Sequence, residues 1–195
     1  MNSRSKFYGF LEGKRVYLRK IRVDDVNEAY FRWMNDSTVN QFLESRFYPH
    51  SLETLKDYVS GKVNDENNAF FAIILKEDDR HIGNIKLGPI NTIHRFADIG
   101  ILIGEKDCWG KGYATEAIHL IVKYAFDKLN LNKVTAGCYA PNKGAIEAFK
   151  KANFSQEGIR KNHCYYNGKY VDDILLGLVR SKSKFPKNNR HADNK

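Results

Sequence analysis

The chain has few cysteines and no long apolar segment, and each absence excludes a class of protein. Cys108, Cys138 and Cys164 are the only cysteines among 195 residues, and they are widely separated. An odd number of separated cysteines without nearby metal-type partners predicts a reducing compartment and no metal site. Neither an apolar run of membrane-spanning length nor an N-terminal stretch of signal-peptide length is present. We therefore expect a cytoplasmic protein without a membrane span.

The chain also lacks a net acidic charge. Its formal charge is +9, and residues 180–195 carry six basic side chains against the single Asp193. More than half of the excess therefore lies in a terminal segment, which is typical of a solvated chain end and does not favour nucleic-acid binding. Length and ordinary globular composition predict one domain over residues 9–182 and a disordered basic tail over 183–195. The remaining charge suits a phosphorylated cofactor.

Two common phosphate-binding motifs are missing from the glycine-rich segment at residues 107–117, which joins an apolar strand to a long helix. The nucleoside-triphosphate motif fails because five residues separate Gly104 from Gly110, and Gly112 stands where a hydroxyl residue is required. The dinucleotide motif fails because Thr115 replaces its third glycine. The two remaining glycines and the start of a helix predict a metal-free pyrophosphate site made of backbone amides.

The order of hydrophobic patterns predicts an α/β (α+β) protein. Alternating and apolar runs bounded by turn residues predict strands, and stripes at helical spacing behind capping residues predict helices. The predicted strands are residues 15–20, 69–75, 81–87, 96–104, 133–139, 154–166 and 169–179. The predicted helices are one capped by Asp24 or Asp25 and running to about Asn35, one capped by Ser51, and two over residues 114–129 and 142–152. Asn167 and Gly168 predict a two-residue hairpin turn between the last two strands.

Residues 109–114 resemble the Gln/Arg-x-x-Gly-x-Gly/Ala signature of the GNAT superfamily of acyl-CoA N-acyltransferases, with Trp109 in place of the commonest first residue. The longer form ending in Thr-Glu-Ala is similar to the ribosomal-protein acetyltransferase (RimJ/RimL) branch. A segment beginning at Asn142, 28 positions after Ala114, is similar to the family's second signature, Asn-x-x-Ser/Ala-x-x-x-Tyr/Phe. The resemblance covers residues 9–181.

This resemblance implies the GNAT fold, with a central mixed, mostly antiparallel sheet flanked by helices. The fourth and fifth predicted strands, residues 96–104 and 133–139, would splay apart and form the acetyl-CoA cleft. A bulge near residues 100–102 would turn one N–H toward the thioester carbonyl as an oxyanion donor. The co-substrate would be acetyl-CoA, with no metal. The implied cofactor-binding residues are Ile101, Leu102, Ile103, Trp109, Gly110, Lys111, Gly112, Tyr113, Ala114, Thr115, Asn142, Ala145 and Phe149.

The catalytic groups cannot all be transferred from the family. Phe149 stands where many relatives have a tyrosine that protonates the departing thiolate, and phenylalanine has no proton to give. Tyr139 is the candidate substitute, with core packing as the competing role. Residues 134–139 contain no carboxylate, although some relatives have a glutamate there. Asp98 is therefore the candidate general base, acting directly or through water, with a structural hydrogen bond as the alternative.

Acceptor contacts are expected from the first two helices, their connector and the final hairpin. The candidates are Trp33, Asn35, Phe47, Tyr48, His94, Tyr165 and Tyr166. We expect direct acetyl transfer to a primary amine of a small molecule or to a protein N-terminus. The positive charge and the lack of an obvious acidic patch favour a nucleotide-linked amino sugar or a small neutral acceptor over a polyamine. A noncatalytic acyl-CoA sensor and a nucleic-acid-associated protein are the alternatives, and the protein is expected to be a monomer or a homodimer.

Overall fold

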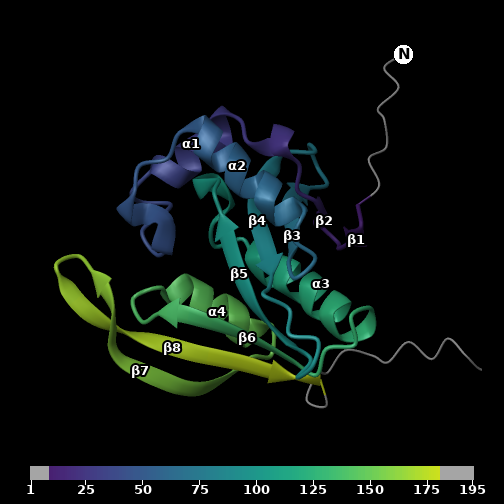
Figure 1. The fold of residues 1–195 in the computed structure, drawn as a ribbon, viewed down its shortest axis with the longest axis vertical. Coiled ribbons are helices and arrows are strands. Elements are labelled where there is room, and N and C mark those ends of the chain that lie inside the picture. The colour runs from purple at the N-terminus through teal and green to yellow at the C-terminus, as the bar shows by residue number, and fades with distance from the viewer. Residues whose placement is uncertain (1–8, 181–195) are drawn as a thin grey trace, which may run out of the picture.

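The computed structural model describes residues 9–180, so the expected domain end at 182 and the tail at 183–195 lie outside the described residues. Within this range the chain forms an eight-stranded sheet flanked by helices (Figure 1). The strands are β1 (Leu11–Glu12), β2 (Val16–Lys20), β3 (Ala69–Leu75), β4 (His81–Leu87), β5 (Phe96–Ile103), β6 (Lys133–Tyr139), β7 (Ser155–Tyr166) and β8 (Lys169–Val179). The helices are α1 (Glu28–Asn35), α2 (Leu52–Val63), α3 (Tyr113–Asp127) and α4 (Lys143–Lys151).

Strand pairing is antiparallel across the described sheet except at its centre. The strand order is β1-β2-β3-β4-β5-β6-β8-β7, and β5 and β6 run parallel. The last strand, β8, lies between β6 and β7 and is antiparallel to both. The expected mixed, mostly antiparallel sheet flanked by helices is therefore confirmed.

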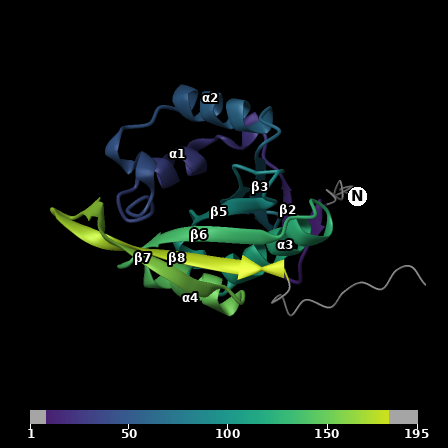
Figure 2. The same ribbon diagram turned by 60° about the horizontal axis from the view of Figure 1, so that its bottom comes forward.

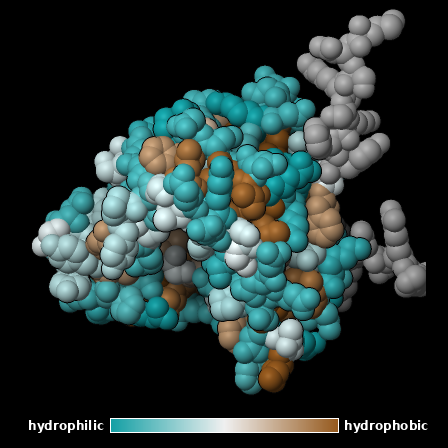
Figure 3. All heavy atoms as spheres, turned by 45° about the horizontal axis from the view of Figure 1, so that its top comes forward, coloured by the Kyte–Doolittle hydropathy of each residue, from teal (hydrophilic) through white to brown (hydrophobic). Residues whose placement is uncertain are grey.

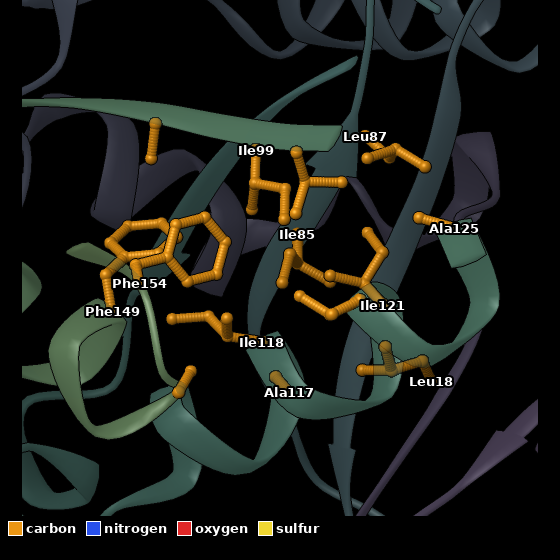
Figure 4. Packing of buried hydrophobic residues seen from close by; sticks show 14 of the residues in the cluster. Leu18, Ile85, Leu87, Ile99, Ala117, Ile118, Ile121, Ala125, Phe149 and Phe154 are labelled. Carbon is orange, nitrogen blue, oxygen red and sulfur yellow. The ribbon is translucent and has the colours of Figure 1, made fainter. Parts of the chain in front are cut away.

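The main core lies between the sheet and α3. Ile118 and Ile121 are fully buried and lie on the side of α3 that faces Leu18 and Ile85 of the sheet (Figure 4). Burying one side chain of this size stabilises the fold by about 1.5 to 3 kcal/mol relative to exposure. The apolar stripe of α3 therefore fixes the helix against the sheet, and the start of the helix is fixed with it.

Residues 21–63, called the roof below, cover the opposite face of the sheet. Figure 2 shows α1 and α2 on one side of the strands and α4 on the other. The roof has its own core, which includes Ile21, Trp33 and Val59. The Trp33 ring packs directly over Gly104, where an added Cβ would lie 2.0 Å from a ring carbon. On the roof side the surface is largely hydrophilic, with limited apolar patches (Figure 3), and no helix within residues 9–180 is long and apolar enough to span a membrane.

Several predicted boundaries agree with the structure. β3, β4 and β6 have the predicted bounds, and Ser51 caps α2 by accepting a hydrogen bond from the Thr54 N–H. Asn167 and Gly168 have φ angles of 49° and 80°, as a two-residue hairpin turn requires. Asn153, just after α4, has a φ of 71°, a left-handed conformation that ends the helix.

The prediction for the first helix was wrong at its start. Residues Val23–Asp25 form a separate 3-10 turn, and α1 begins only at Glu28. Asp25 does not cap the helix, because its carboxylate binds the Arg19 guanidinium at 2.6 Å and accepts the Arg22 N–H. Asn27 caps α1 instead, with its side-chain oxygen accepting from two amides of the first turn. The short strand β1 and the 3-10 turn at Glu44–Phe47 were not predicted.

The Arg19–Asp25 pair should stabilise the roof in a pH-dependent way. Hydrogen bonds from Arg19 and Arg22 outweigh the desolvation that raises the pKa of Asp25, so this pKa is lowered. Its contribution is therefore present above the ordinary aspartate pKa and is lost as pH falls through the lowered one. Asp25→Asn should lower the free energy of unfolding by about 2 to 3 kcal/mol at pH 7, because it leaves Arg19 partly buried without its partner.

Urea unfolding of the wild type and Asp25→Asn at neutral pH and near pH 3 measures this effect. The difference between the two proteins should shrink at the lower pH. Asp24→Asn, at the exposed neighbouring carboxylate, should change stability by less than about 0.5 kcal/mol. Equal losses for the two variants would contradict the assignment.

Candidate active site

The centre of the sheet opens because β5 and β6 separate. Only three residue pairs join the two strands, and the last is Asp98 with Thr135. Both strands continue well beyond this pair. Figure 1 shows the two strands diverging from this point. A cleft of about 830 Å³ lies in the gap, lined by residues 99–103 and 137–139 and by the first turns of α3 and α4. The predicted splay is therefore confirmed.

Some peptide groups of β5 face this gap although the strand has no bulge. The register between β4 and β5 is regular from Gly83↔Ile103 to Leu87↔Ile99, so the bulge expected at residues 100–102 was wrong. The Gly88 N–H donates to the Asp98 carbonyl. In an antiparallel pair alternate residues bond to the same neighbour, so the peptide groups of Asp98, Gly100 and Leu102 are directed toward β4. The N–H and C=O groups of Ile99 and Ile101 consequently point toward β6, into the gap.

The two other residues expected on this strand have different surroundings. The peptide groups of Leu102 face β4, and its side chain packs against the roof core. The Ile103 carbonyl is occupied, because it accepts a hydrogen bond of 2.8 Å from the Trp109 indole. Trp109 thus covers the end of β5, which gives this departure from the family signature a structural role.

The glycine loop has the backbone geometry of an anion-binding turn. Gly110 and Gly112 have φ angles of 72° and 82°, in the left-handed region that favours glycine. Gly112 is the N-cap of α3 and has no side chain to accept a hydrogen bond from the first turn. The first amides of a helix have no acceptor within the helix, and here Tyr113, Ala114 and Thr115 all line the cleft. Lys111 is in the loop but does not line the cleft.

An ion pair fixes the loop to the start of β2. Arg15 donates from its guanidinium to the Lys111 carbonyl at 2.8 Å and to the Glu116 carboxylate at 2.9 Å. The same carboxylate accepts the backbone N–H groups of Arg15 and Val16. These hydrogen bonds outweigh desolvation and lower the pKa of Glu116. Glu116 therefore connects the loop to the sheet and does not act on the helix dipole alone.

The start of α4 forms the other wall on this side. The Asn142 side chain accepts the Ala145 N–H at 3.2 Å and caps the helix. Asn142, Ala145 and Phe149 all line the cleft. Phe149 is only 2% exposed and packs edge to face against Phe154, with ring centroids 5.0 Å apart (Figure 4). Its ring is therefore both cleft wall and core.

Two glycines border the gap on the face of the sheet that is turned toward the roof. Side chains alternate along a strand, so Asp98 and Gly100 of β5 face the roof, while Ile99 packs into the α3 core. Thr135 donates to the Asp98 carboxylate at 2.8 Å, which places Thr135 and Gly137 of β6 on the same face. Each glycine thus lies two residues beyond the last β5–β6 pair. We call the opening between Gly100 and Gly137 the glycine window.

Two carboxylates flank the glycine window. Asp98 is accessible to solvent on its roof side, yet the surrounding protein desolvates it enough to raise its pKa, against the Thr135 hydrogen bond. Asp173 of β8 is buried, lines the cleft and has a carboxylate oxygen 3.3 Å from the position of a Cβ on Gly137. Arg160 of β7 contacts Asp173 at 3.3 Å. An amine entering the window would meet both acids.

Tyr139 is held on the roof side. Its hydroxyl donates to the Glu44 carboxylate and lies 3.1 Å from a guanidinium nitrogen of Arg46. Burial first, and then the hydrogen bond to Glu44, raise the pKa of Tyr139 to about 12. The phenol is therefore protonated at neutral pH, and its proton points to the roof.

Contacts between the roof and the last hairpin close one end of the cleft. Arg46 donates to the Tyr165 carbonyl at 2.6 Å, and the Tyr166 hydroxyl donates to Gln41 at 2.9 Å. The Phe42 ring stacks on Tyr166 with centroids 5.2 Å apart. Segments far apart in the chain thus form a continuous wall.

The expected acceptor residues of α1 do not reach the cleft. Trp33 is 3% exposed, and its indole donates to Glu105 at 2.9 Å. Asn35 exchanges hydrogen bonds with the backbone of His50 and so closes the loop between the roof helices. Both side chains are used to build the roof, which corrects the expectation that they contact the acceptor.

The other acceptor candidates are also outside the cleft lining. Tyr48 is 75% exposed, and the ring of His94 stacks on Phe96. The exposed Tyr165 ring packs against Tyr170, and only the Tyr165 carbonyl contacts the roof. Residues that line the cleft without having been expected include Phe42, Glu44, Lys143, Glu147, Lys151, Arg160, His163 and Asp173. The only sequence signal for Asp173 was a carboxylate directly before the apolar run at residues 174–176, and the adjacent Asp172 shares this pattern.

The chain is similar to known acetyltransferases over most of its length. A family model described as "Acetyltransferase (GNAT) domain" matches residues 15–155. A probable N-acetyltransferase, YjcK, of Bacillus subtilis is 31% identical over 180 residues, covering 87% of this chain and 96% of the relative. Spermidine N(1)-acetyltransferase of Escherichia coli K12 is 29% identical over 161 residues, covering 83% and 84%.

The fold agrees with the same relationship. The structure of spermidine N-acetyltransferase from Vibrio cholerae in complex with CoA and spermine has a TM-score of 0.78 and 25% identity, covering 86% of this chain and 97% of that one. An acetyltransferase of the GNAT family from Bacillus anthracis has a TM-score of 0.76 at 22% identity, which shows the fold alone. With its glycine loop, its separated central strands and a family match over most of its length, the chain belongs to the GNAT acetyltransferase family.

Proposed function

We propose that the protein transfers the acetyl group of acetyl-CoA directly to the primary amine of a small molecule that enters through the glycine window. The observation that carries this proposal is the different chemistry of the two sides of one cleft. Backbone donors line the α3–α4 side together with Lys143, Lys151 and one acid, Glu147, while Asp98 and Asp173 flank the opposite side. A phosphorylated thioester fits the first side and an ammonium group the second.

On the donor side, backbone amides would bind the pyrophosphate. The positive end of α3 and the amides after Gly112 favour an anion without a metal. Lys143 and Lys151 add positive charge along the same wall. The N–H of Ile99 or Ile101 would donate to the thioester carbonyl, whose oxygen gains charge as the amine attacks. A backbone donor of this kind is worth about 3 to 4 kcal/mol of transition-state stabilisation in other enzymes.

On the acceptor side, the incoming ammonium must lose a proton before its nitrogen can attack. A lysine-like amine is neutral in about one molecule in 2,500 at pH 7, which corresponds to about 4.6 kcal/mol. Asp98 is suited to accept this proton, because desolvation raises its pKa above the ordinary aspartate value and so makes it a stronger base. Asp173 would hold the ammonium by charge. The new C–N bond forms as the C–S bond breaks, and the proton reaches Asp98 directly or through water.

The departing thiolate does not require an acid. A thiol pKa of about 8.5 makes CoA a tolerable leaving group near neutral pH. The proton of Tyr139 is hydrogen-bonded to Glu44, away from the α4 side. We therefore propose that Tyr139 fixes the segment between α1 and α2 in place. Proton donation to the thiolate is its second candidate role.

The acceptor is proposed to be a small amine that is not a polycation. Each carboxylate near the window has a cation beside it, namely Arg160 for Asp173, Lys86 for Asp98 and Arg46 for the Glu44–Tyr139 pair. Little uncompensated negative charge remains for a second ammonium. A polyamine is the second candidate, because two relatives are named as spermidine acetyltransferases.

The branch of the family, the compartment, the oligomeric state and the domain bounds are also proposed. Residues 109–117 support membership of the RimJ/RimL branch, and the protein is proposed to act in the cytoplasm as a monomer or a homodimer. Residues 9–182 are proposed to form a single domain.

An acceptor screen tests the function directly. Acetyl-CoA should release free CoA thiol in the presence of an amino-sugar nucleotide, an amino acid, a peptide N-terminus or spermidine, with a matching N-acetyl product by mass spectrometry. We expect the highest kcat/KM with an acceptor that is not a polycation. Binding of acetyl-CoA without turnover on any amine would favour a sensor and contradict the proposal. Preference for spermidine would contradict the acceptor class only.

Gly112→Ala tests the donor side. A φ of 82° is unfavourable for alanine, and the new Cβ would lie 3.3 Å from Arg15. The displaced amides should raise the KM for acetyl-CoA about 10-fold or more, with little change in the KM for the amine. Gly168→Ala, which strains a φ of 80° at the hairpin turn, is the matched control and should leave the acetyl-CoA KM unchanged. Equal effects of the two variants would refute the loop's role.

Asp98→Asn tests the base through the pH dependence of kcat/KM. The loss should be about 100-fold or more near neutral pH and should shrink as pH approaches the pKa of the amine, because free amine then no longer needs a base. Thr135→Val removes the hydrogen bond that favours the ionised carboxylate, so it should move the acid limb of the profile to higher pH. A wild-type rate and profile in Asp98→Asn would rule out this assignment.

A further inference from the structure

We infer that the glycine window selects acceptors whose amine is attached to a ring or branched carbon. This inference rests on the proposed function and concerns the same site. Its starting point is the placement of Gly100 and Gly137, each two residues beyond the last β5–β6 pair and on the same face of the sheet.

Glycine inside a strand weakens the strand, so its presence calls for a reason. Other strand glycines have a reason within the fold. A Cβ on Gly83 would lie 2.1 Å from the Leu102 carbonyl oxygen, so close packing against the backbone excludes a side chain there. A Cβ on Gly177 would lie 2.4 Å from the Glu157 carboxyl group, which would have to move, and Gly158 adjoins an irregularity in the β7–β8 register.

Gly100 and Gly137 have no such reason. A Cβ on Gly100 would meet no atom within 4 Å, and a Cβ on Gly137 would approach only the Asp173 carboxyl group, at 3.3 to 3.8 Å. The register of β5 is regular at Gly100, so a bulge does not explain it either. The remaining reason for glycine in a strand is the close approach of a ligand.

The position of the window says which part of the ligand approaches. The peptide groups of Ile99, on the strand between Asp98 and Gly100, face the gap where the thioester would lie. The amine nitrogen must enter that gap, so the carbon bonded to it lies between the two glycines. A CH2 group needs no extra room there. A carbon with two substituents fills the spaces that the two missing Cβ atoms leave, one toward each strand.

The test compares two amines that carry one amino group and no other charged group. In cyclohexylamine a ring carbon bears the nitrogen, and in hexylamine a CH2 group bears it. The wild type should have the higher kcat/KM with cyclohexylamine. Gly100→Ala should lower kcat/KM for cyclohexylamine about 10-fold or more, since one methyl group in a pocket discriminates by about 10- to 200-fold. For hexylamine the change should be less than about 2-fold, and the KM for acetyl-CoA should be unchanged.

Gly61→Ala, in α2 with no atom within 4 Å of the added Cβ, is the control and should affect neither amine. Equal losses for both amines in Gly100→Ala, or a wild-type preference for hexylamine, would overturn the inference while the proposed function stands. Calorimetric titration of the CoA-bound protein with each amine separates the selectivity of the window from acetyl transfer. Selective binding of cyclohexylamine that Gly100→Ala removes, without any acetylation, would support the window and contradict the proposed function.

Discussion

The loss of pairing between β5 and β6 beyond Asp98 and Thr135 is the constraint on which the rest of the site depends. Each strand keeps its other neighbour, β4 for β5 and β8 for β6, so the sheet remains continuous while its centre opens. Unpaired peptide groups in a closed core would each cost about 1 to 3 kcal/mol. Here those of Ile99 and Ile101 face a cleft, where water or a ligand can satisfy them.

The opening divides the molecule into two chemical sides. The α3 core fixes the glycine loop, and the Arg15–Glu116 pair connects it to β2, so the first amides of α3 are held in place by the fold itself. On the other face, Arg46, in the segment between α1 and α2, contacts the Tyr139 hydroxyl of β6 and donates to the Tyr165 carbonyl of the hairpin. Such preorganisation matters because reacting groups must be held within a narrow range of geometry. Donor and acceptor can therefore approach the same point from opposite faces.

The sequence predicted most of the fold and the backbone geometry of the glycine loop, because both depend on local patterns. The alternation of β3, β4 and β6 and the two loop glycines gave boundaries and φ angles that agree with the structure. The acceptor side depends on contacts between distant segments. Asp173 reaches the cleft only because β8 lies between β6 and β7, and exposed and core aromatics such as Tyr48 and Trp33 have the same local pattern. The regular β4–β5 register at Gly100 could not be predicted either. The isoleucine-rich sequence of β5 does not indicate which of its peptide groups pair with β4 and which face the gap.

Hydrogen–deuterium exchange with and without acetyl-CoA, resolved to single amides, tests the central claim most directly. We expect slower exchange in the complex for the amides of Ile99 and Ile101 and for those of Tyr113, Ala114 and Thr115. Amides of β5 that already bond to β4, such as Gly100 and Leu102, should change little. Protection of Gly100 and Leu102 without protection of Ile99 and Ile101, or an unchanged start of α3, would contradict the claim that the thioester arm lies in the gap between the separated strands.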